Sequence, residues 1–168
     1  MTIERIDPPL LGSERATLTS FLDWHRGTLA VKCEGLTGDQ LRLQSMPPST
    51  LSLLGLVRHL AEVERTWFRR TLAGEDIPLI YSDAGDYQAC YNAVGADVDE
   101  AFATWRAEIT LAREIEARAP GLDAEGLQPK WQERVSLRWI LTHMIEEYAR
   151  HNGHADFLRE GIDGVTGE

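Results

Sequence analysis

Residues 136–160 read S-L-R-W-I-L-T-H-M-I-E-E-Y-A-R-H-N-G-H-A-D-F-L-R-E, and this stretch decides the fold class. Apolar residues recur in it every three or four positions, which is the spacing of one face of an α-helix. Ser136 is a good N-cap, and Gly161 follows as a stop signal. The stretch therefore predicts an amphipathic helix over about residues 136–159, with one face turned to a core.

The same period appears in three other segments, which predict helices over 13–32, 49–74 and 91–119, the second capped by Ser49 or Thr50. Four such amphipathic segments predict an all-α fold, a four-helix bundle formed by residues 1–168 as a single domain. Almost no segment alternates as a strand would, and we expect a polar loop between residues 120 and 135. The connections around 35–49 and 75–90 are long, so we expect them to cover a site or to carry short extra helices.

The charge balance limits the classes of partner. With 17 basic and 27 acidic residues the formal net charge is −10, which argues against nucleic acid and anionic membranes, because phosphate groups need a basic surface. No apolar run approaches the roughly 18 residues of a membrane-spanning helix. Cys33 and Cys90 form no CxxC pair, so we interpret them as small core residues of a protein in the reduced cytoplasm.

The five histidines are candidate functional residues, and three of them lie in the predicted last helix. Glu147 and His151 are four residues apart, so a helix projects both from one face. On a helical wheel His151 falls within the apolar arc and Glu147 on its margin, whereas His143 and His154 fall nearer the solvent edge. A carboxylate that is partly buried needs a partner, which can be an arginine, a hydrogen-bond network or a metal ion.

A third candidate ligand, His59, lies in the middle of the predicted second helix. His59, Glu147 and His151 together offer two imidazole nitrogens and a carboxylate oxygen to one ion. The residues alone leave a plainer interpretation open, in which each histidine is hydrogen-bonded in the core and the Glu–His pair occurs by chance. His143 is either a rival of Glu147 or a supporting group, and His25 is expected to be structural or exposed.

The remaining candidates are given mainly structural roles. Five tryptophans are expected to be packing anchors, with one or two lining a pocket: Trp24, Trp67, Trp105, Trp131 and Trp139. Arg58 and Arg150 can hold a carboxylate near the mouth of the bundle, although ordinary surface charge is the plainer interpretation. Tyr148 is expected in the core rather than as a catalytic acid.

Two stretches of the chain resemble a known family. They are S-T-L-S-L-L-G-L-V-R-H-L-A-E-V-E-R-T-W-F at 49–68 and L-T-H-M-I-E-E-Y-A-R-H-N-G-H-A-D-F-L-R-E at 141–160. Both resemble the DinB-like superfamily, and most closely its branch related to mycothiol-dependent transferases and the N-terminal domain of maleylpyruvate isomerases. The resemblance covers nearly the whole chain and implies a four-helix bundle of the DinB/YfiT-like type with long connecting loops.

The resemblance also implies which residues bind a metal. The metal triad of the family falls on His59, Glu147 and His151. Glu147 stands where many DinB proteins have a histidine, and this matches the branch that uses mycothiol. Asn152-Gly153 replaces the Arg-Gly pair of many relatives, and His154 stands where many have Gln or Glu, which leaves its role open.

The implied cofactors are a divalent metal, with Zn²⁺ expected first and Ni²⁺, Fe²⁺, Co²⁺ and Mn²⁺ left open, and mycothiol or a similar thiol as cosubstrate. Three protein ligands leave a coordination position open, and a thiol bound to a cation loses its proton readily. We therefore expect a thiol S-transferase or isomerase that acts on a small-molecule thiol and an electrophile. Two alternatives stay open. One is a non-catalytic, stress-associated metal-binding bundle, with a homodimer also open, and the other is an interaction module in which Glu147 pairs with an arginine.

Overall fold

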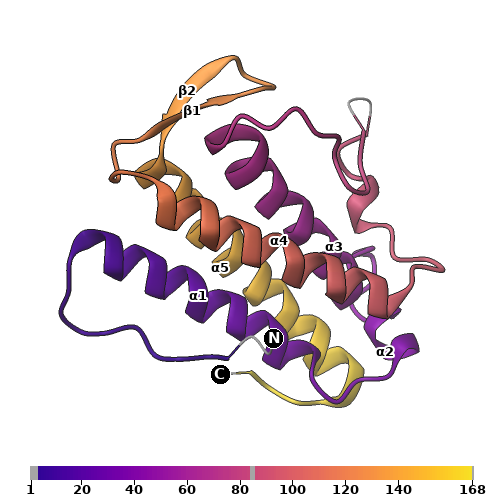
Figure 1. Cartoon of the computed structure of the whole chain (residues 1–168). Coiled ribbons are helices and arrows are strands. Elements are labelled where there is room, and N and C mark those ends of the chain that lie inside the picture. Colours follow the sequence, from indigo (N-terminus) through magenta and orange to yellow (C-terminus); the bar gives the residue numbers. More distant parts are fainter. Residues whose placement is uncertain (1–3, 84–85, 168) are drawn as a thin grey trace.

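A computed structural model of the protein describes residues 4–83 and 86–167. Four long helical segments pack side by side in it (Figure 1): α1 (Glu14–Cys33), α3 (Leu53–Glu64), α4 (Val98–Arg118) and α5 (Leu137–Asp163). Helix α1 packs mainly against α5, and α3 packs mainly against α4. The predicted all-α four-helix bundle is therefore confirmed.

Shorter elements fill the connections between the long helices. They are α2 (Gly38–Arg42), the π-helix η1 (Arg65–Leu72), the 3₁₀ turn η2 (Ala89–Tyr91) and the strands β1 (Glu125–Gln128) and β2 (Glu133–Ser136). The expectation of short extra helices in the two long connections is confirmed by α2 and η2. The expected polar loop between 120 and 135 was wrong, because β1 and β2 pair there as an antiparallel hairpin at one end of the bundle (Figure 1).

Two helix starts differ from the predictions because another residue provides the cap. The Ser52 hydroxyl accepts a hydrogen bond from the Gly55 amide, so α3 begins at Leu53 and not after Ser49 or Thr50. Helix α4 begins at Val98 and not at residue 91, because the Asp97 carboxylate caps its first turn. The apolar pattern before this cap was misleading.

The end of α5 also lies further along the chain than predicted. Gly161 does not stop the helix but packs against Ser45, where an added Cβ would lie 3.1 Å from its side chain. The helix ends instead at Gly164, whose φ of 78° is left-handed and suits glycine.

A buried hydrogen-bond network joins the four long helices. The Arg26 guanidinium of α1 donates to both carboxylate oxygens of Glu64 on α3, each at 2.7 Å. The Tyr148 hydroxyl of α5 donates to Glu64 at 2.8 Å, and the Trp105 indole of α4 donates to that hydroxyl at 2.8 Å. Arg26 is 2% exposed and Glu64 is fully buried. Burial alone would lower the pKa of Arg26, but the nearby charges, that of Glu64 first, raise it overall.

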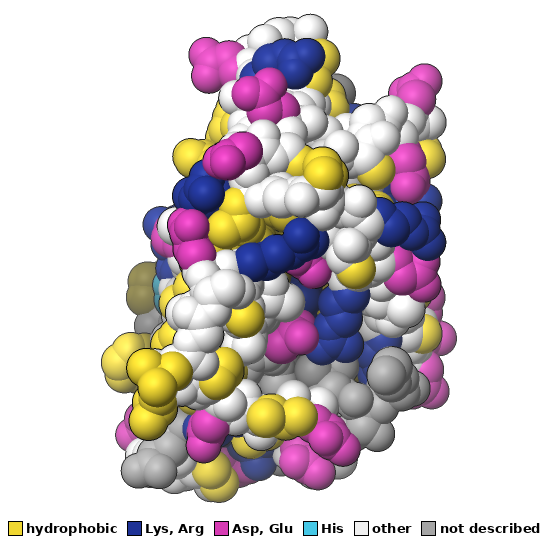
Figure 2. All heavy atoms as spheres, turned by 60° about the vertical axis from the view of Figure 1, so that its left-hand side comes forward, with side chains coloured by type: hydrophobic (Ala, Val, Ile, Leu, Met, Phe, Trp, Pro, Cys, Tyr) yellow, Lys and Arg dark blue, Asp and Glu magenta, His cyan; other side chains and the backbone are white. Residues whose placement is uncertain are grey.

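The outer surface mixes charges of both signs. On the face shown in Figure 2, Lys and Arg side chains are interspersed with Asp and Glu side chains, and hydrophobic side chains lie between them. This face therefore presents no continuous basic patch among the described residues. Within residues 4–83 and 86–167, no helix has the length and apolar character needed to cross a membrane.

Replacing Glu64 by Gln should destabilise the protein strongly, because it removes the buried carboxylate that binds both the Arg26 guanidinium and the Tyr148 hydroxyl. Arg26 then keeps only the partly exposed carboxylate of Asp23 as an ion-pair partner among the described residues. Breaking one side of a buried ion pair typically costs about 3–5 kcal/mol. The matched control is Glu114→Gln, which removes an exposed ion pair with Arg118 and should cost less than about 1 kcal/mol. Urea unfolding followed by circular dichroism measures both values. Equal losses for the two variants would show that the buried pair does not join the bundle as described.

Candidate metal centre

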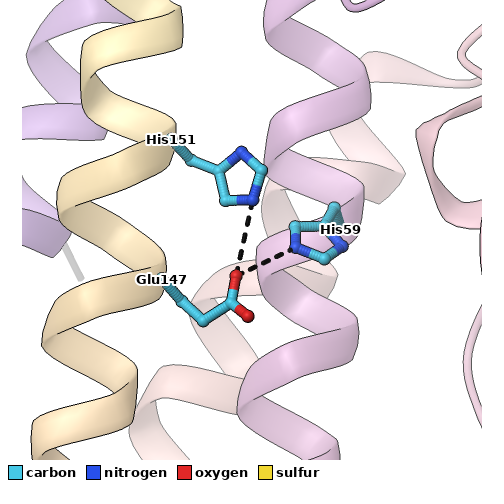
Figure 3. Close-up of side chains that lie close together, drawn as sticks. All are labelled: His59, Glu147 and His151. Carbon is cyan, nitrogen blue, oxygen red and sulfur yellow. Dashed lines mark ion pairs between the residues drawn. The ribbon is translucent and has the colours of Figure 1, made fainter.

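Helices α3 and α5 bring together the three residues that the sequence suggested as ligands. Figure 3 shows the Glu147 carboxylate pointing from α5 toward His151 on the same helix and His59 on α3. One oxygen, Oε2 of Glu147, lies 3.5 Å from Nε2 of His59 and 3.4 Å from Nε2 of His151. The i, i+4 spacing on α5 places its two residues one turn apart, and the packing of α3 supplies the third.

The three side chains fit a divalent cation. A tetrahedral Zn²⁺ ion with bonds of about 2.0–2.1 Å separates its ligand atoms by about 3.3 Å, close to the two distances here. The His59 Nε2 atom is buried and has no well-formed hydrogen bond among the described residues. A buried nitrogen without a partner is costly unless it binds something else. The donor set of two imidazoles and one carboxylate is one that Zn²⁺ and its neighbours in the first transition series accept.

Electrostatics favour the protonation states that metal binding needs. Burial lowers the pKa of His59, although the neighbouring Glu147 carboxylate acts in the opposite direction. The close approach of His151 and His59 holds the pKa of Glu147 well below its usual range, against the effect of burial. At neutral pH, His59 is therefore a neutral imidazole and Glu147 a carboxylate, which are the forms that bind a cation.

A second layer of contacts orients the three side chains. Nδ1 of His151 lies 3.3 Å from Nδ1 of His154, and Nδ1 of His59 lies 3.5 Å from the Cys90 sulfur. The other oxygen of Glu147, Oε1, lies 3.5 Å from Nε2 of His143. When Nε2 of His151 presents its lone pair, its Nδ1 carries the proton and donates to His154. His154, whose role the sequence left open, thus contacts the back of a candidate ligand.

His143 does not join the other two histidines. Its Nδ1 lies 3.4 Å from Glu146 and its Nε2 faces Glu147, so these three residues form a second acidic cluster. Glu146 is exposed and already pairs with Arg150. The structure therefore places His143 as a neighbour of Glu147 on the side away from His59 and His151.

Tyr91 covers the centre, which the sequence did not reveal. Its ring stacks on the His59 imidazole at 4.3 Å with an interplanar angle of 17°, and its hydroxyl lies 3.4 Å from Nε2 of His151. Burial raises the pKa of Tyr91, so the hydroxyl stays protonated. Gly55 permits this approach, since a Cβ there would lie 2.5 Å from the Tyr91 carbonyl oxygen. The sequence offered one indication that this segment covers a site, namely the unusual length of the connection around 75–90.

Beside the centre lies a cleft of about 390 Å³. His59 and Glu147 line one part of it, and the π-helix η1 and the β1–β2 hairpin line another. The hairpin can lie directly on η1 because Gly126 has no side chain, and an added Cβ would lie 2.2 Å from the Thr71 carbonyl oxygen. Trp67 and Trp131 also line the cleft, which confirms the expectation that some tryptophans border a pocket.

The other sequence candidates have structural partners. Arg58 donates to the Cys90 carbonyl at 3.2 Å and covers the Tyr81 ring, while Arg150 pairs with Glu146. Both arginines thus have partners within the protein. Tyr148 lies in the core, as expected.

The cysteines and His25 also lie where the sequence suggested. Both cysteines are buried, and burial raises the pKa of Cys33 to about 12 and that of Cys90 to about 11, so neither is a thiolate at neutral pH. The His25 backbone carbonyl accepts a hydrogen bond from the Asn152 amide at 3.0 Å. This contact joins α1 to α5, which is a structural role.

Comparison with known proteins identifies the family. The family model described as mycothiol S-transferase matches residues 17–164, which include all four long helices except the first turn of α1. A search of the curated proteins found no match. The match covers most of the chain and contains His59, Glu147 and His151. The chain therefore belongs to the mycothiol S-transferase family, within the DinB-like superfamily.

Proposed function

We propose that His59, Glu147 and His151 hold one divalent cation, with Zn²⁺ first and Ni²⁺ as an alternative. We propose further that the protein transfers mycothiol, or a similar small thiol, to an electrophile. The observation that carries the proposal is the convergence of three ligand atoms beside an open cleft. Oε2 of Glu147 lies 3.5 Å from Nε2 of His59 and 3.4 Å from Nε2 of His151. Family membership supports the thiol and the transfer reaction.

Three protein ligands leave room for a further group, which is typical of catalytic rather than structural zinc sites. When bound, the cation would supply Lewis acidity, which lowers the pKa of a thiol coordinated to it. Glu147 adds a negative charge, while the two imidazoles are neutral donors. The Tyr91 hydroxyl lies beside Nε2 of His151 and remains protonated, so it can donate a hydrogen bond to a group held at the site.

In the proposed reaction the sulfur of the thiol gives up its proton to solvent and forms a bond to carbon of the electrophile. Where the electrophile carries a leaving group, that group departs with its bonding electrons. The cleft supplies the room for this second substrate next to His59 and Glu147. A non-catalytic metal-binding protein would need the ligands but not the cleft, and for this reason we favour an enzyme.

Removing any one of the three ligands should abolish tight metal binding. Protein purified without a histidine tag should bind one equivalent of Zn²⁺, and His59→Ala, Glu147→Gln and His151→Ala should each weaken it. We expect a loss beyond the 10–100-fold that is typical of outer partners. Competition with a chromophoric chelator measures the dissociation constants.

His143→Ala is the matched control, since it removes a neighbouring histidine of the second cluster. It should lower the affinity for Zn²⁺ by no more than about 10–100-fold, as for an outer partner. Unchanged affinity in His59→Ala and His151→Ala, or a greater loss in His143→Ala, would contradict the proposed ligand set.

Zinc-loaded protein should accelerate the conjugation of mycothiol with monochlorobimane, in which the sulfur displaces chloride and a fluorescent product forms. The rate should exceed that of mycothiol alone, and it should fall to that background after chelation or in His151→Ala. Several other low-molecular-weight thiols are compared in parallel. Metal bound at the triad without any conjugation above background would support the non-catalytic alternative.

A further inference from the structure

One cation in the cleft, Arg70, has no ion-pair partner in the part of the chain that the structure describes. The Arg70 side chain, on η1, lines the cleft and is half-buried. Among the described residues no hydrogen bond, ion pair or ring contact of its guanidinium is found. A guanidinium carries five donors and cannot lose its proton. Because no ion pair of this half-buried guanidinium is found among the described residues, its donors are free to bind an anion from outside.

Neighbouring arginines of the same segment behave differently. Arg65 donates to Glu108 at 2.6 Å, and Arg69 contacts both Glu108 and Glu75. The arginines on this side of η1 are therefore paired with a carboxylate of α4 and with one in the connection that follows η1. The chain has ten more acidic than basic residues, so a missing carboxylate partner for Arg70 is not explained by a shortage of acids.

A second cation borders the same cleft. Lys130, in the turn of the β1–β2 hairpin, lies with its ammonium 4.1 Å from the centre of the Tyr87 ring. No carboxylate partner of Lys130 is found among the described residues. Glu62 also lines the cleft, but its oxygens accept from the backbone amides of residues 80, 81 and 82. Glu62 is therefore already hydrogen-bonded, and neither it nor Glu147, the other acid of the lining, forms an ion pair with Arg70 or Lys130 in the described part of the chain.

The cleft also has an aromatic wall. Trp67 packs against Trp131 at 5.4 Å and against Trp139 at 5.0 Å between ring centres, and His143 stacks on Trp139 at 4.9 Å. Both Trp67 and Trp131 line the cleft. Trp131 is 48% exposed, whereas Trp67 is buried. Indole faces favour flat apolar groups, and cations favour carboxylates.

We propose that Arg70 and Lys130, with the Trp67 and Trp131 side chains, form a subsite for an electrophile that has a flat apolar body and a carboxylate. The assignment of this ligand as the electrophile rests on the proposed function. The anion-binding subsite itself does not, because it uses neither metal nor thiol. The carboxylate is held by the cations, and the apolar body lies along the tryptophans toward His59 and Glu147.

Calorimetric titration with trans-cinnamate and with its neutral analogue trans-cinnamamide tests the subsite. The full chain is used in its zinc-loaded form and again after removal of metal with EDTA, so that binding of the carboxylate to zinc is separated from binding to the cations. Both forms should prefer the carboxylate by about tenfold, as for a charge-assisted hydrogen bond. Saturating mycothiol should not displace cinnamate from the zinc-loaded protein.

The variant Arg70→Gln should remove this preference in the metal-free protein, and Lys130→Gln should reduce it. The matched control is Arg106→Gln, an exposed arginine of α4 that covers the Phe102 ring and should leave the preference unchanged. Circular dichroism confirms that each variant is folded.

Equal binding of acid and amide in the metal-free protein would overturn the subsite, and so would a preference that survives in both Arg70→Gln and Lys130→Gln. Displacement of cinnamate by mycothiol would assign the cleft to the thiol and overturn the assignment to the electrophile. If the protein prefers cinnamate to cinnamamide but catalyses no conjugation of mycothiol, this result would count against the proposed function alone.

Discussion

The buried ion pair between Arg26 and Glu64 is the interaction on which the rest of the structure depends. Glu64 also accepts from Tyr148, which accepts from Trp105, so one connected network reaches all four long helices. Because each donor and acceptor is buried, sliding one helix along another would leave a charge or a hydroxyl without a partner. Such a loss is expensive in the interior, and the network therefore fixes the helix register.

This register positions the candidate metal centre. Tyr148 directly follows Glu147 in α5, and Glu64 lies little more than one turn after His59 in α3. The same two helices that are joined through Glu64 and Tyr148 thus bring the imidazole of His59 within 3.5 Å of the Glu147 carboxylate. The buried network thus fixes the two helices that carry the candidate metal centre. The charge of Glu147 is stabilised by the two histidines rather than by an arginine. This last point disfavours the interaction module considered from the sequence.

Local patterns in the sequence predicted the helices and half of the centre. Apolar periodicity located the long helices, and the i, i+4 spacing predicted that Glu147 and His151 share a face, because both features depend only on residues close in the chain. The approach of His59 to this pair depends on packing between helices, so the residues alone made it one candidate beside a plainer interpretation, and the family resemblance strengthened it. Its ligand role is still a proposal.

Features that depend on close approach of distant backbones were not predictable. Tyr91 was assigned to a helix, yet it covers His59 because Gly55 leaves room for its carbonyl. The hairpin was assigned to a loop, yet it lies on η1 because Gly126 leaves room for Thr71. A single glycine in a sequence does not say which backbone will pass over it. The sequence therefore predicted that some tryptophans line a pocket, but not where this pocket lies or which cations border it.

The most direct test of the account is the location of the metal. Crystals of untagged protein incubated with one equivalent of Zn²⁺ would be measured at the zinc absorption edge. The account predicts one anomalous peak, about 2.0–2.2 Å from Nε2 of His59, Nε2 of His151 and a carboxylate oxygen of Glu147. A peak only at His143 and Glu146, or no peak between α3 and α5, would contradict it.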